Sequence, residues 1–537
     1  MTMPMAPRRV ILVSGGSKVY VEPHIALAQS LQRRGHHVKI ASECCLKSYI
    51  ESFGIVFQSL CSNDLCDFLG IESTFSSSSD IQRSPHAHQI LESYRRNLID
   101  VDVIIASGAS IYPAYSIAQK KAIAFIPLFL QPVMPTSEFY SVFTQNFLDR
   151  LCFFRKKWTH ECLFTVNWMA ENKAMDYNDW RRNTLSLEAF GKKGLLDELM
   201  KNTEIPILMP CSTLLCGLKQ RKPHDYDKRM YVGGFMYPEE RRMHVDRDLL
   251  DFIYTCNDAF SEEEKEASSS QVRDSRPLVY IGFDDMLIHK PLSFLGMLCE
   301  VSSSMPCRFV VEVRGSNLFT DEACSQVIKS CRDTIVVRNF VDRDWLLPKV
   351  QCILHHCGVD IIGAILRAGV PNIPCPSSQT SQQKLAKHLV THNLAQYEIP
   401  FGKLNSAKLL RTLQIVLDST SGYRQSEIAR KTAIFVRQES QKSISMYCDV
   451  ISSVNPRKQW KSDQIRCQTN VQPFIRASEE FCTVLKARRY TQRLRKDGSK
   501  SFRRFKLKYR VALVNGVRID SSCMPLVRFR KQCPQLE

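Results

Sequence analysis

The sequence predicts an α/β protein with two domains, each built on a parallel β-sheet. Three observations support this fold class. The chain has 537 residues, which is more than one hydrophobic core usually accommodates. Short apolar runs alternate with helical patterns in both halves of the chain, as expected of strand–helix–strand units. A charged, serine-rich stretch, Ser261–Ser275, separates the two series and has the composition of an interdomain linker.

The first half begins with a strand–helix–strand unit. Val10–Val13 is an apolar run closed by a Ser-Gly-Gly turn, which is typical of a buried strand. A helical pattern starts near Pro23 and stops at Gly35, and its buried face is expected to contain Ile25, Leu27, Ala28 and Leu31. Further strands are expected at Val38–Ala41, Val101–Ala106 and Ala124–Phe129. The polar, aperiodic stretch Ser73–His88 predicts a loop.

The second half repeats this organisation. Apolar runs next to helical patterns predict strands at Leu278–Phe283, Arg308–Val313, Thr334–Val337 and Cys352–His355. A longer helical pattern follows at Ser426–Val450. The expected divisions are a first domain at 1–240, a linker at 241–275, a second domain at 276–425, a return helix at 426–454 and an extension at 455–537.

Composition favours a globular protein outside the membrane. Hydrophobic residues make up 44% of the chain and charged residues 24%, the usual balance for a soluble domain. The apolar runs are shorter than a bilayer span, and the amino terminus has only a four-residue apolar stretch at Val10–Val13 before its glycine turn. We therefore expect a first strand and not a signal peptide, and a cytoplasmic location that includes peripheral binding to membranes.

The cysteine pattern indicates free thiols. The chain has 21 cysteines and no Cys-x-x-Cys pair, which is the spacing that structural zinc sites favour. The interpretation we favour is a set of small, mostly buried residues in a reducing compartment.

Basic residues are concentrated near the carboxyl terminus. The segment Lys486–Arg510 contains twelve Lys or Arg against one acid, Asp497, and therefore carries +11 of the net charge of +19. Val484–Lys496 suggests a basic helix, and the Asn515-Gly516 pair between apolar runs predicts a hairpin. We expect a small β-rich appendage with a basic face. Its partner is an anionic membrane surface or, as a less favoured alternative, nucleic acid, and a merely solvated face remains open.

Several segments between residues 8 and 425 resemble, in order, the sterol 3-beta-glucosyltransferase family of UDP-glycosyltransferases. They are GGSKVYVEPHIALAQSLQRRGHHV near the amino terminus, QPVMPTSEF, NDWRRNTLSL, YVGGFMY, VYIGFDDM and the run from Asp344 to Pro376 (DWLLPKVQCILHHCGVDIIGAILRAGVPNIPCP). The resemblance implies a GT-B fold, in which two Rossmann-like domains face a cleft. It also implies transfer of a hexose from a UDP-sugar to a sterol or other lipid hydroxyl, with inversion and without a cofactor or metal.

The resemblance places Tyr20 where the family has the aspartate thought to deprotonate the acceptor. A phenol has a pKa of about 10 and is a poor base at neutral pH. Glu22 and His24 lie nearby and are alternative bases, His24 having the better-matched pKa. The interpretation we favour is that Tyr20 plugs the cleft and that Glu22 and His24 are surface residues at a helix start.

The donor-binding motifs of the family are also altered. The family's phosphate-binding turn HHGGAGTT corresponds here to His355, His356, Cys357, Gly358, Val359, Asp360, Ile361 and Ile362, and its GFGSM turn to Gly282, Phe283, Asp284, Asp285 and Met286. Thr380 and Ser381 stand where the family has its sugar-binding Asp-Gln pair. The family's donor residues that remain are His355, His356, Gly358 and Trp345.

These changes lead to two interpretations of the donor site. A carboxylate about 4 Å from a phosphate charge costs roughly 4 kcal/mol at an effective dielectric constant near 20, so Asp284, Asp285 and Asp360 should weaken donor binding. Drift in an unused site explains this best, whereas a Mg²⁺ ion bridging the three carboxylates and the phosphates is the alternative. The sequence thus predicts a weakly active hexosyltransferase or, as the competing hypothesis, a catalytically inactive binding protein with the same fold.

Overall fold

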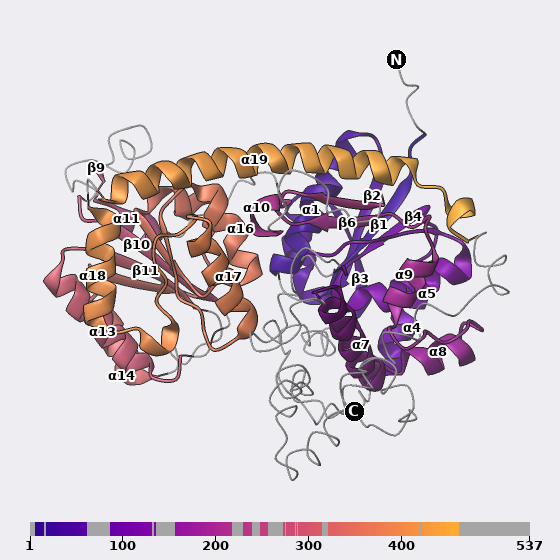
Figure 1. Ribbon diagram of the computed structural model, residues 1–537, viewed down its shortest axis with the longest axis horizontal. Coiled ribbons are helices and arrows are strands. Elements are labelled where there is room, and N and C mark those ends of the chain that lie inside the picture. Colours follow the sequence, from indigo (N-terminus) through magenta and orange to yellow (C-terminus); the bar gives the residue numbers. More distant parts are fainter. Residues whose placement is uncertain are drawn as a thin grey trace, which may run out of the picture. The chain divides into compact units, whose positions relative to one another are not determined.

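A computed structural model describes residues 6–15, 18–61, 86–130, 134–135, 156–216, 229–238, 247–255, 272–273, 275–284, 286, 288–313, 321–418 and 421–460. The chain divides into two compact units (Figure 1). Unit 1 contains Met1–Glu239 and Ser440–Glu537, and unit 2 contains Glu240–Glu439. Residues 247–255 of the expected linker 241–275 instead form a helix and a short strand of unit 2. The remaining linker residues, apart from 272, 273 and 275, lie outside the described residues, as do the basic segment Lys486–Arg510 and the predicted β-rich appendage.

Unit 1 contains a parallel five-stranded sheet with the strand order β3-β2-β1-β4-β5. Its strands are β1 (Arg9–Val13), β2 (His37–Glu43), β3 (Val56–Cys61), β4 (Val103–Ala106) and β5 (Ala124–Pro127). The helices between them are α1 (Lys18–Arg33), α2 (Lys47–Glu51), α4 (Ala87–Asn97) and α5 (Ile111–Lys121). Alternate residues of each strand enter different cores, as the two-residue period of a strand requires.

After β5, the described residues of the stretch Met1–Glu239 in unit 1 form four helices and two short strands. The helices are α7 (Lys156–Met175), α8 (Tyr177–Asn183), α9 (Leu195–Lys201) and α10 (Thr213–Cys216), and the paired parallel strands are β6 (Ile207–Pro210) and β7 (Met230–Gly233). A parallel bridge between Leu128 and Leu208 connects these strands to the chain after β5. Helices α4, α5, α7, α8 and α9 supply the core on one face of the sheet, and α1 supplies the core on the other.

The motif Asn178–Leu187 has a structural role in unit 1. Arg181 is only 2% exposed, and its guanidinium donates to Ser116 Oγ at 2.7 Å and to Gln119 Oε1 at 2.8 Å. The same group lies 3.9 Å from the ring centroid of Phe190. Burial lowers the pKa of Arg181, and these contacts compensate the buried cation.

Unit 2 contains a second parallel five-stranded sheet with the order β12-β11-β10-β13-β14. Its strands are β10 (Leu278–Asp284), β11 (Arg308–Val313), β12 (Ile335–Arg338), β13 (Cys352–His355) and β14 (Asn372–Pro374), and β8 (Tyr254–Thr255) pairs with β9 (Val272–Arg273) apart from it. The helices are α11 (Arg247–Ile253), α13 (Pro291–Ser304), α14 (Glu322–Ser330), α15 (Arg343–Leu346), α16 (Val359–Ala368), α17 (Thr380–Thr391) and α18 (Ser406–Leu417).

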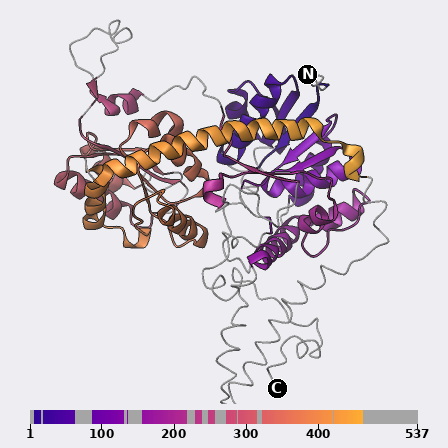
Figure 2. The same ribbon diagram turned by 45° about the horizontal axis from the view of Figure 1, so that its top comes forward.

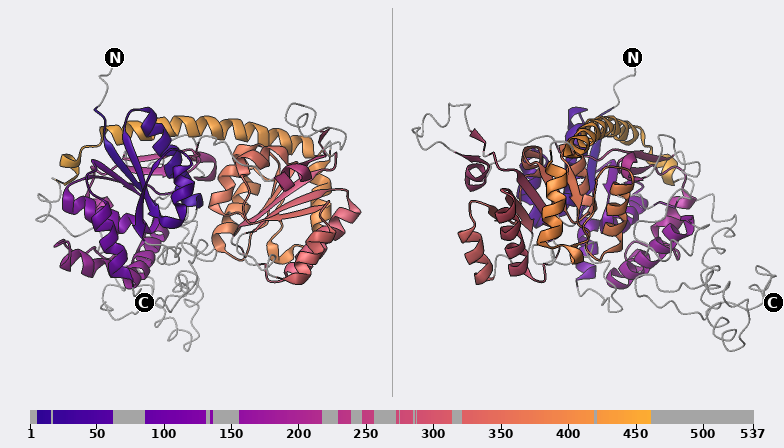
Figure 3. Two further views of the ribbon diagram at one scale, coloured as in Figure 1. Left: turned by 180° about the vertical axis from the view of Figure 1, so that it is seen from behind. Right: turned by 60° about the vertical axis from the view of Figure 1, so that its left-hand side comes forward.

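Helices cover both faces of this second sheet (Figure 3). Val279, Ile281 and Phe283 of β10 point into a core that α13, α14 and α18 complete. Leu278 and Tyr280 point into the opposite core, which α11, α15 and α16 complete. The two sheets confirm the predicted α/β fold with two parallel-sheet domains.

A single helix, α19 (Ser421–Ser453), belongs to both units (Figure 2). Its first part packs in unit 2, where Ala433 lies against Gly369. Its last part packs in unit 1, where Tyr447 donates to the carbonyl oxygen of Met209 at 3.0 Å. Ser443 Oγ accepts from Gly234 N at 2.8 Å, and a Cβ on Gly233 would lie 2.1 Å from the same oxygen. This close approach explains the first glycine, Gly233, of the YVGGFMY motif.

The chain after α19 completes the sheet of unit 1. Gln459 is fully buried, and its side-chain amide bonds both the N–H and the carbonyl oxygen of Phe125, at 2.8 and 3.0 Å. The Gln459 side chain therefore makes the two backbone hydrogen bonds at Phe125 that a neighbouring strand would otherwise make. Trp460 donates to the carbonyl oxygen of Ile123 at 2.8 Å. Residues beyond the point where the family resemblance stops are thus part of the first domain's packing.

Candidate functional site

The candidate donor site lies at the carboxyl edge of the unit 2 sheet. Gly282 of β10 and His355 of β13 are partners in the parallel register, so the turns that follow these two strands lie at the same edge. Parallel open sheets bind ligands at this edge. The described residues of the two altered motifs, GFDDM and HHCGVDII, therefore lie at the same edge of the sheet.

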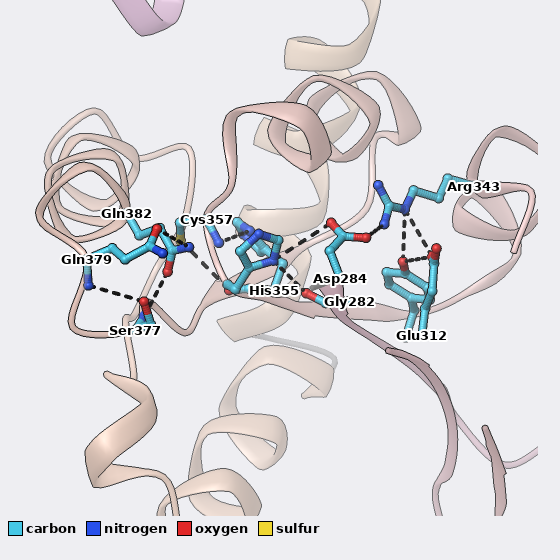
Figure 4. A network of polar contacts seen from close by, with 11 residues as sticks. Gly282, Asp284, Glu312, Arg343, His355, Cys357, Ser377, Gln379 and Gln382 are labelled. Atoms are coloured by element: carbon cyan, nitrogen blue, oxygen red, sulfur yellow. Dashed lines mark hydrogen bonds and ion pairs between the residues drawn. The ribbon is translucent and has the colours of Figure 1, made fainter. Parts of the chain in front are cut away.

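A buried ionic network occupies part of this edge (Figure 4). Arg343, at the start of α15, forms an ion pair with Asp284, and its Nε lies 3.0 Å from Glu312 Oε2. Tyr280 donates its hydroxyl to Glu312 at 2.5 Å. Glu312 is fully buried and Asp284 is 4% exposed. Burial, together with the nearby carboxylates, raises the pKa of Tyr280 well above its usual value, so Tyr280 remains a donor.

This network changes the electrostatic expectation for Asp284. The repulsion of about 4 kcal/mol assumed a carboxylate facing a phosphate without a cation of its own. Asp284 instead has Arg343 on one side, and its Oδ2 lies 4.0 Å from His356 Nδ1. The guanidinium offsets the carboxylate charge, so Asp284 repels an anion less than the sequence suggested. Neither Arg343 nor Glu312 was among the predicted site residues.

Two residues at this edge keep a backbone conformation that suits glycine. Asp284 has φ +44° and Cys357 has φ +66°, and both stand where the family has glycine. A side chain in this left-handed region costs roughly 1–2 kcal/mol. Both turns therefore hold a residue other than glycine in a conformation that glycine adopts at lower cost.

The helix α16 begins directly after the second turn. Gly358 is its N-cap residue, and Asp360 is the second residue of the helix, although the side chain of Asp360 lies outside the described part. Ile361 is fully buried, and a Cβ on Gly282 would lie 2.4 Å from its Cδ1. Ile361 therefore fills the space beside Gly282 and has no exposed surface for contact with a nucleotide.

The two histidines are held by neighbouring strands. His356 Nδ1 lies 3.2 Å from the carbonyl oxygen of Gly282, and His355 Nε2 lies 3.2 Å from Asn372 Oδ1. His355 Nδ1 accepts from Cys357 N at 3.3 Å. Complete burial lowers the pKa of His355 to about 3, so this imidazole is neutral at physiological pH. His355 thereby supports the turn rather than supplying a charge.

The lowered pKa of His355 predicts a loss of stability in mild acid. The unfolded chain takes up a proton near the ordinary histidine pKa of 6.5, whereas the folded chain does not until its own pKa of about 3. Between about pH 7.5 and pH 5, this difference should lower the free energy of unfolding by about 2 kcal/mol. Denaturant unfolding at both pH values should show that His355→Gln loses less stability on acidification than the unmodified chain. A matched His392→Gln variant, at an exposed position, should not. Equal pH dependence in all three proteins would contradict the assignment.

Trp345 is half-buried beside the network. Its backbone N–H is capped by Asp342 at the start of α15, and Lys349 Nζ lies 4.3 Å from the centroid of its ring. Lys349 also donates to the carbonyl oxygen of Trp345 at 2.8 Å. One face of the indole is therefore already covered by a cation of the chain itself.

The region of the family's sugar-binding pair begins helix α17. Gln382 accepts from Ser377 N at 3.0 Å through Oε1 and donates to Gln379 Oε1 at 3.1 Å (Figure 4). Thr380 and Ser381 form the first two residues of the helix, and Ser381 is half-buried. The side chain of Thr380 lies outside the described part. Two glutamines thus hold the turn in which the family carries its Asp-Gln pair.

The candidate bases in unit 1 lie on α1. The backbone of Tyr20 belongs to the helix, while its side chain lies outside the described part. Glu22 is half-buried and accepts from the Tyr49 hydroxyl at 2.9 Å. His24 is fully buried, so the expectation that it is a surface residue is wrong. In this conformation His24 has no surface at which it could meet an acceptor.

The proposed Mg²⁺ bridge has no counterpart among the described residues. Asp285 and the side chain of Asp360 lie outside them. Within the described part of the chain, no group of three or more His, Cys, Asp or Glu residues is arranged to hold a metal ion. Likewise, none of the described helices is long and apolar enough to cross a bilayer.

Comparison with known proteins connects this geometry to glycosyltransferases. The model of the glycosyltransferase family 28 N-terminal domain matches residues 10–131. A sterol 3-beta-glucosyltransferase of Sclerotinia sclerotiorum is 25% identical over 390 residues, covering 70% of this chain and 24% of that protein. Another from Komagataella phaffii is 24% identical over 451 residues, covering 82% of this chain and 34% of that protein. The chain thus spans a quarter to a third of the length of these relatives.

Solved structures agree on the fold. The glycotransferase of kitacinnamycin matches with a TM-score of 0.54 and 16% identity, over 84% of this chain and 99% of that one. A UDP-glucosyltransferase from Polygonum tinctorium matches with a TM-score of 0.54 and 14% identity, over 83% of this chain and 99% of that one. The two parallel five-stranded sheets therefore match the GT-B fold, and the chain is distantly homologous to sterol 3-beta-glucosyltransferases.

Proposed function

We propose that the chain binds a UDP-sugar in unit 2 and transfers the hexose, slowly and with inversion, to the hydroxyl group of a sterol or another lipid. The substrate classes come from the relatives, which are sterol 3-beta-glucosyltransferases. The match to the family 28 N-terminal domain supports an acceptor-side role for the first domain. No cofactor is needed for this chemistry.

The observation that carries the proposal is the arrangement at the carboxyl edge of the unit 2 sheet. Helix α16 begins at Val359, three residues after His356, and His356 Nδ1 lies 3.2 Å from the carbonyl oxygen of Gly282 in the neighbouring strand. A helix N-terminus presents unpaired backbone N–H groups and a partial positive charge, which favour phosphate. Arg343 lies at the same edge, but the carboxylates of Asp284 and Glu312 more than offset its charge. The helix N-terminus therefore favours a diphosphate at this position, with an affinity that the two carboxylates reduce.

A second candidate function is a binding protein that has lost transfer chemistry. The observation favouring it is in unit 1, where His24 is fully buried and Glu22 accepts a hydrogen bond from Tyr49. A general base must reach the proton it removes, and Tyr20 is poorly suited by its ordinary pKa. This candidate would use the donor site, or the basic segment Lys486–Arg510, for recognition alone.

A titration and a transfer assay separate the two functions. Calorimetry with UDP and UDP-glucose, with and without Mg²⁺, should show weak binding, because Glu312 and Asp284 together outweigh Arg343. Transfer of labelled glucose to a sterol in detergent micelles would support the transferase, and binding without transfer would support the binding protein. Absence of any UDP binding would contradict the donor site. Binding that requires Mg²⁺ would favour the carboxylate bridge.

If transfer is detected, variants of α1 test the base. Of Glu22 and His24, only Glu22 has exposed surface at which it could act as the base. We therefore expect Glu22→Ala to lower the rate of the transfer step more than His24→Ala does. Full activity in both variants would remove these residues from the mechanism.

We also propose that the segment Lys486–Arg510 attaches the protein to anionic membranes and so brings the lipid acceptor within reach. Each cation near an anionic leaflet contributes on the order of 1 kcal/mol, so engagement of half of the twelve gives useful affinity. Truncation after residue 484 should abolish co-sedimentation with vesicles that contain phosphatidylserine. Unchanged sedimentation would show that the segment is not the anchor. Binding to nucleic acid alone, at matched ionic strength, would contradict the membrane role.

A further inference from the structure

The geometry points to Cys299 and Cys331 as a redox-sensitive pair that forms a reversible disulfide when the protein meets a peroxide. The pair lies in the helical layer of unit 2 formed by α13, α14 and α18, and neither cysteine belongs to the candidate donor site. The site is therefore a modification site, with hydrogen peroxide as the oxidant and a small-molecule thiol as the reductant.

The positions of the two sulfur atoms carry the inference. Cys299 lies on α13, and Cys331 is the C-cap residue of α14, so two packed helices present them to each other (Figure 1). Their Sγ atoms are 3.2 Å apart. A disulfide bond is about 2.05 Å long, so an approach of roughly 1.2 Å suffices for bond formation. We expect rotation about the Cα–Cβ bonds of the two cysteines to provide this movement.

Access to solvent distinguishes this pair from the buried cysteines of the same unit. Cys299 and Cys331 are both partly exposed, whereas Cys307, Cys324, Cys352, Cys357 and Cys375 are buried. Burial raises the pKa of Cys352 to about 12, which keeps that thiol protonated and unreactive. A small oxidant can therefore reach the pair and not the buried thiols.

The chemistry assigns a different role to each cysteine. Burial and the hydrogen bond with Cys331 raise the pKa of Cys299 to about 11, so Cys299 remains a thiol at neutral pH. The Cys331 thiolate attacks the peroxide, the O–O bond breaks, and Cys331 becomes a sulfenic acid while hydroxide leaves and is protonated to water. The Cys299 sulfur then attacks the Cys331 sulfur, the S–O bond breaks, and the Cys299 proton leaves with the hydroxyl group as a second water. Overall, two thiols lose two electrons to one hydrogen peroxide, giving one disulfide and two waters.

Peptide mapping of the intact chain tests the site. The protein is treated with hydrogen peroxide, free thiols are blocked, and the chain is digested with trypsin and with a protease that cleaves after glutamate. Glu300 lies between Cys299 and Cys307, so the second protease separates these cysteines into different peptides. We expect a Cys299–Cys331 cross-linked peptide that disappears on treatment with dithiothreitol.

Thermal unfolding provides a second readout. The cross-link joins residues 32 positions apart and restricts the unfolded chain, so oxidation should raise the unfolding midpoint of unit 2 by several degrees. Cys299→Ser and Cys331→Ser should show no such rise, whereas the exposed matched control Cys45→Ser should retain it. Oxidation of the two cysteines only to separate sulfinic acids, or pairing of either one with another cysteine, would overturn the inference. A midpoint that rises equally in the serine variants would do the same.

Discussion

Replacing Arg343 with methionine should lower the free energy of unfolding of unit 2 by about 3–5 kcal/mol, because it removes the arginine that pairs with two buried carboxylates. Arg343 contacts both Asp284 and Glu312, which are 4% and 0% exposed. Methionine fills a similar volume, so the loss of stability should come mainly from the missing charge and less from altered packing. Urea unfolding, followed by a signal from unit 2, measures this loss in the free energy of unfolding.

Three further variants make this result specific. Arg343→Lys keeps the charge but loses the planar fork, so its cost should be smaller. Arg332→Met removes an arginine whose side chain is 84% exposed and should change stability by less than about 0.5 kcal/mol. The double variant Arg343→Met with Glu312→Gln should be more stable than Arg343→Met alone, because it also removes the buried negative charge of Glu312. A loss below about 1 kcal/mol in Arg343→Met would show that the carboxylates do not depend on this cation.

The sequence predicted four of the five described strands in each sheet, several with different ends, and missed one edge strand of each sheet. The bounds of Arg308–Val313 and Cys352–His355 agree with β11 and β13, because these central parallel strands contain the apolar runs Phe309–Val311 and Cys352–Leu354. The edge strands β3 and β14 were not predicted. Val56 of β3 is 56% exposed, and β14 has three residues and ends in proline, so neither presents a long apolar run.

Two predictions about helix α1, its first residue and the exposure of His24, were wrong. Pro23 suggested a helix start, but the helix begins at Lys18 and contains Pro23 within it. His24 precedes Ala28 by four residues and Leu31 by seven, so it shares the face already predicted to be buried. Helical spacing alone therefore contained the evidence that His24 is a buried residue.

The ionic network could not be predicted from local patterns. Asp284 and Arg343 are 59 residues apart, and their contact depends on which strand ends share an edge of the sheet. The run Asp342-Arg343-Asp344 reads as an ordinary charged helix start, which it also is, since Asp342 caps α15. The relevant signal was topological. Residues that follow different strands of one parallel sheet gather at its carboxyl edge.

The network leads to the second large expected effect, which concerns affinity for UDP and rests on the proposed donor site. In formal charge, Arg343 contributes +1 while Asp284 and Glu312 contribute −1 each, so the cluster carries a net negative charge. Asp284→Asn makes the cluster neutral. A unit charge about 5 Å away changes the energy of a phosphate by roughly 3 kcal/mol at an effective dielectric constant near 20. UDP should therefore bind on the order of a hundredfold more tightly to the variant.

Asparagine is chosen at position 284 because it removes the charge with little change in the backbone conformation or in the pairing of Arg343. Asp284 has φ +44°, and asparagine tolerates this left-handed conformation better than most residues, so the turn should retain its shape. Glu312 still pairs with Arg343 in the variant, so the arginine remains compensated.

The matched control Asp321→Asn makes the same change in net charge and keeps an N-cap residue on α14, where Asp321 accepts from two backbone N–H groups. Calorimetry should show UDP affinity unchanged within about twofold in this control. An unchanged affinity in Asp284→Asn would mean that the diphosphate does not approach this edge of the sheet. Equal gains in both variants would mean that net charge alone attracts the nucleotide.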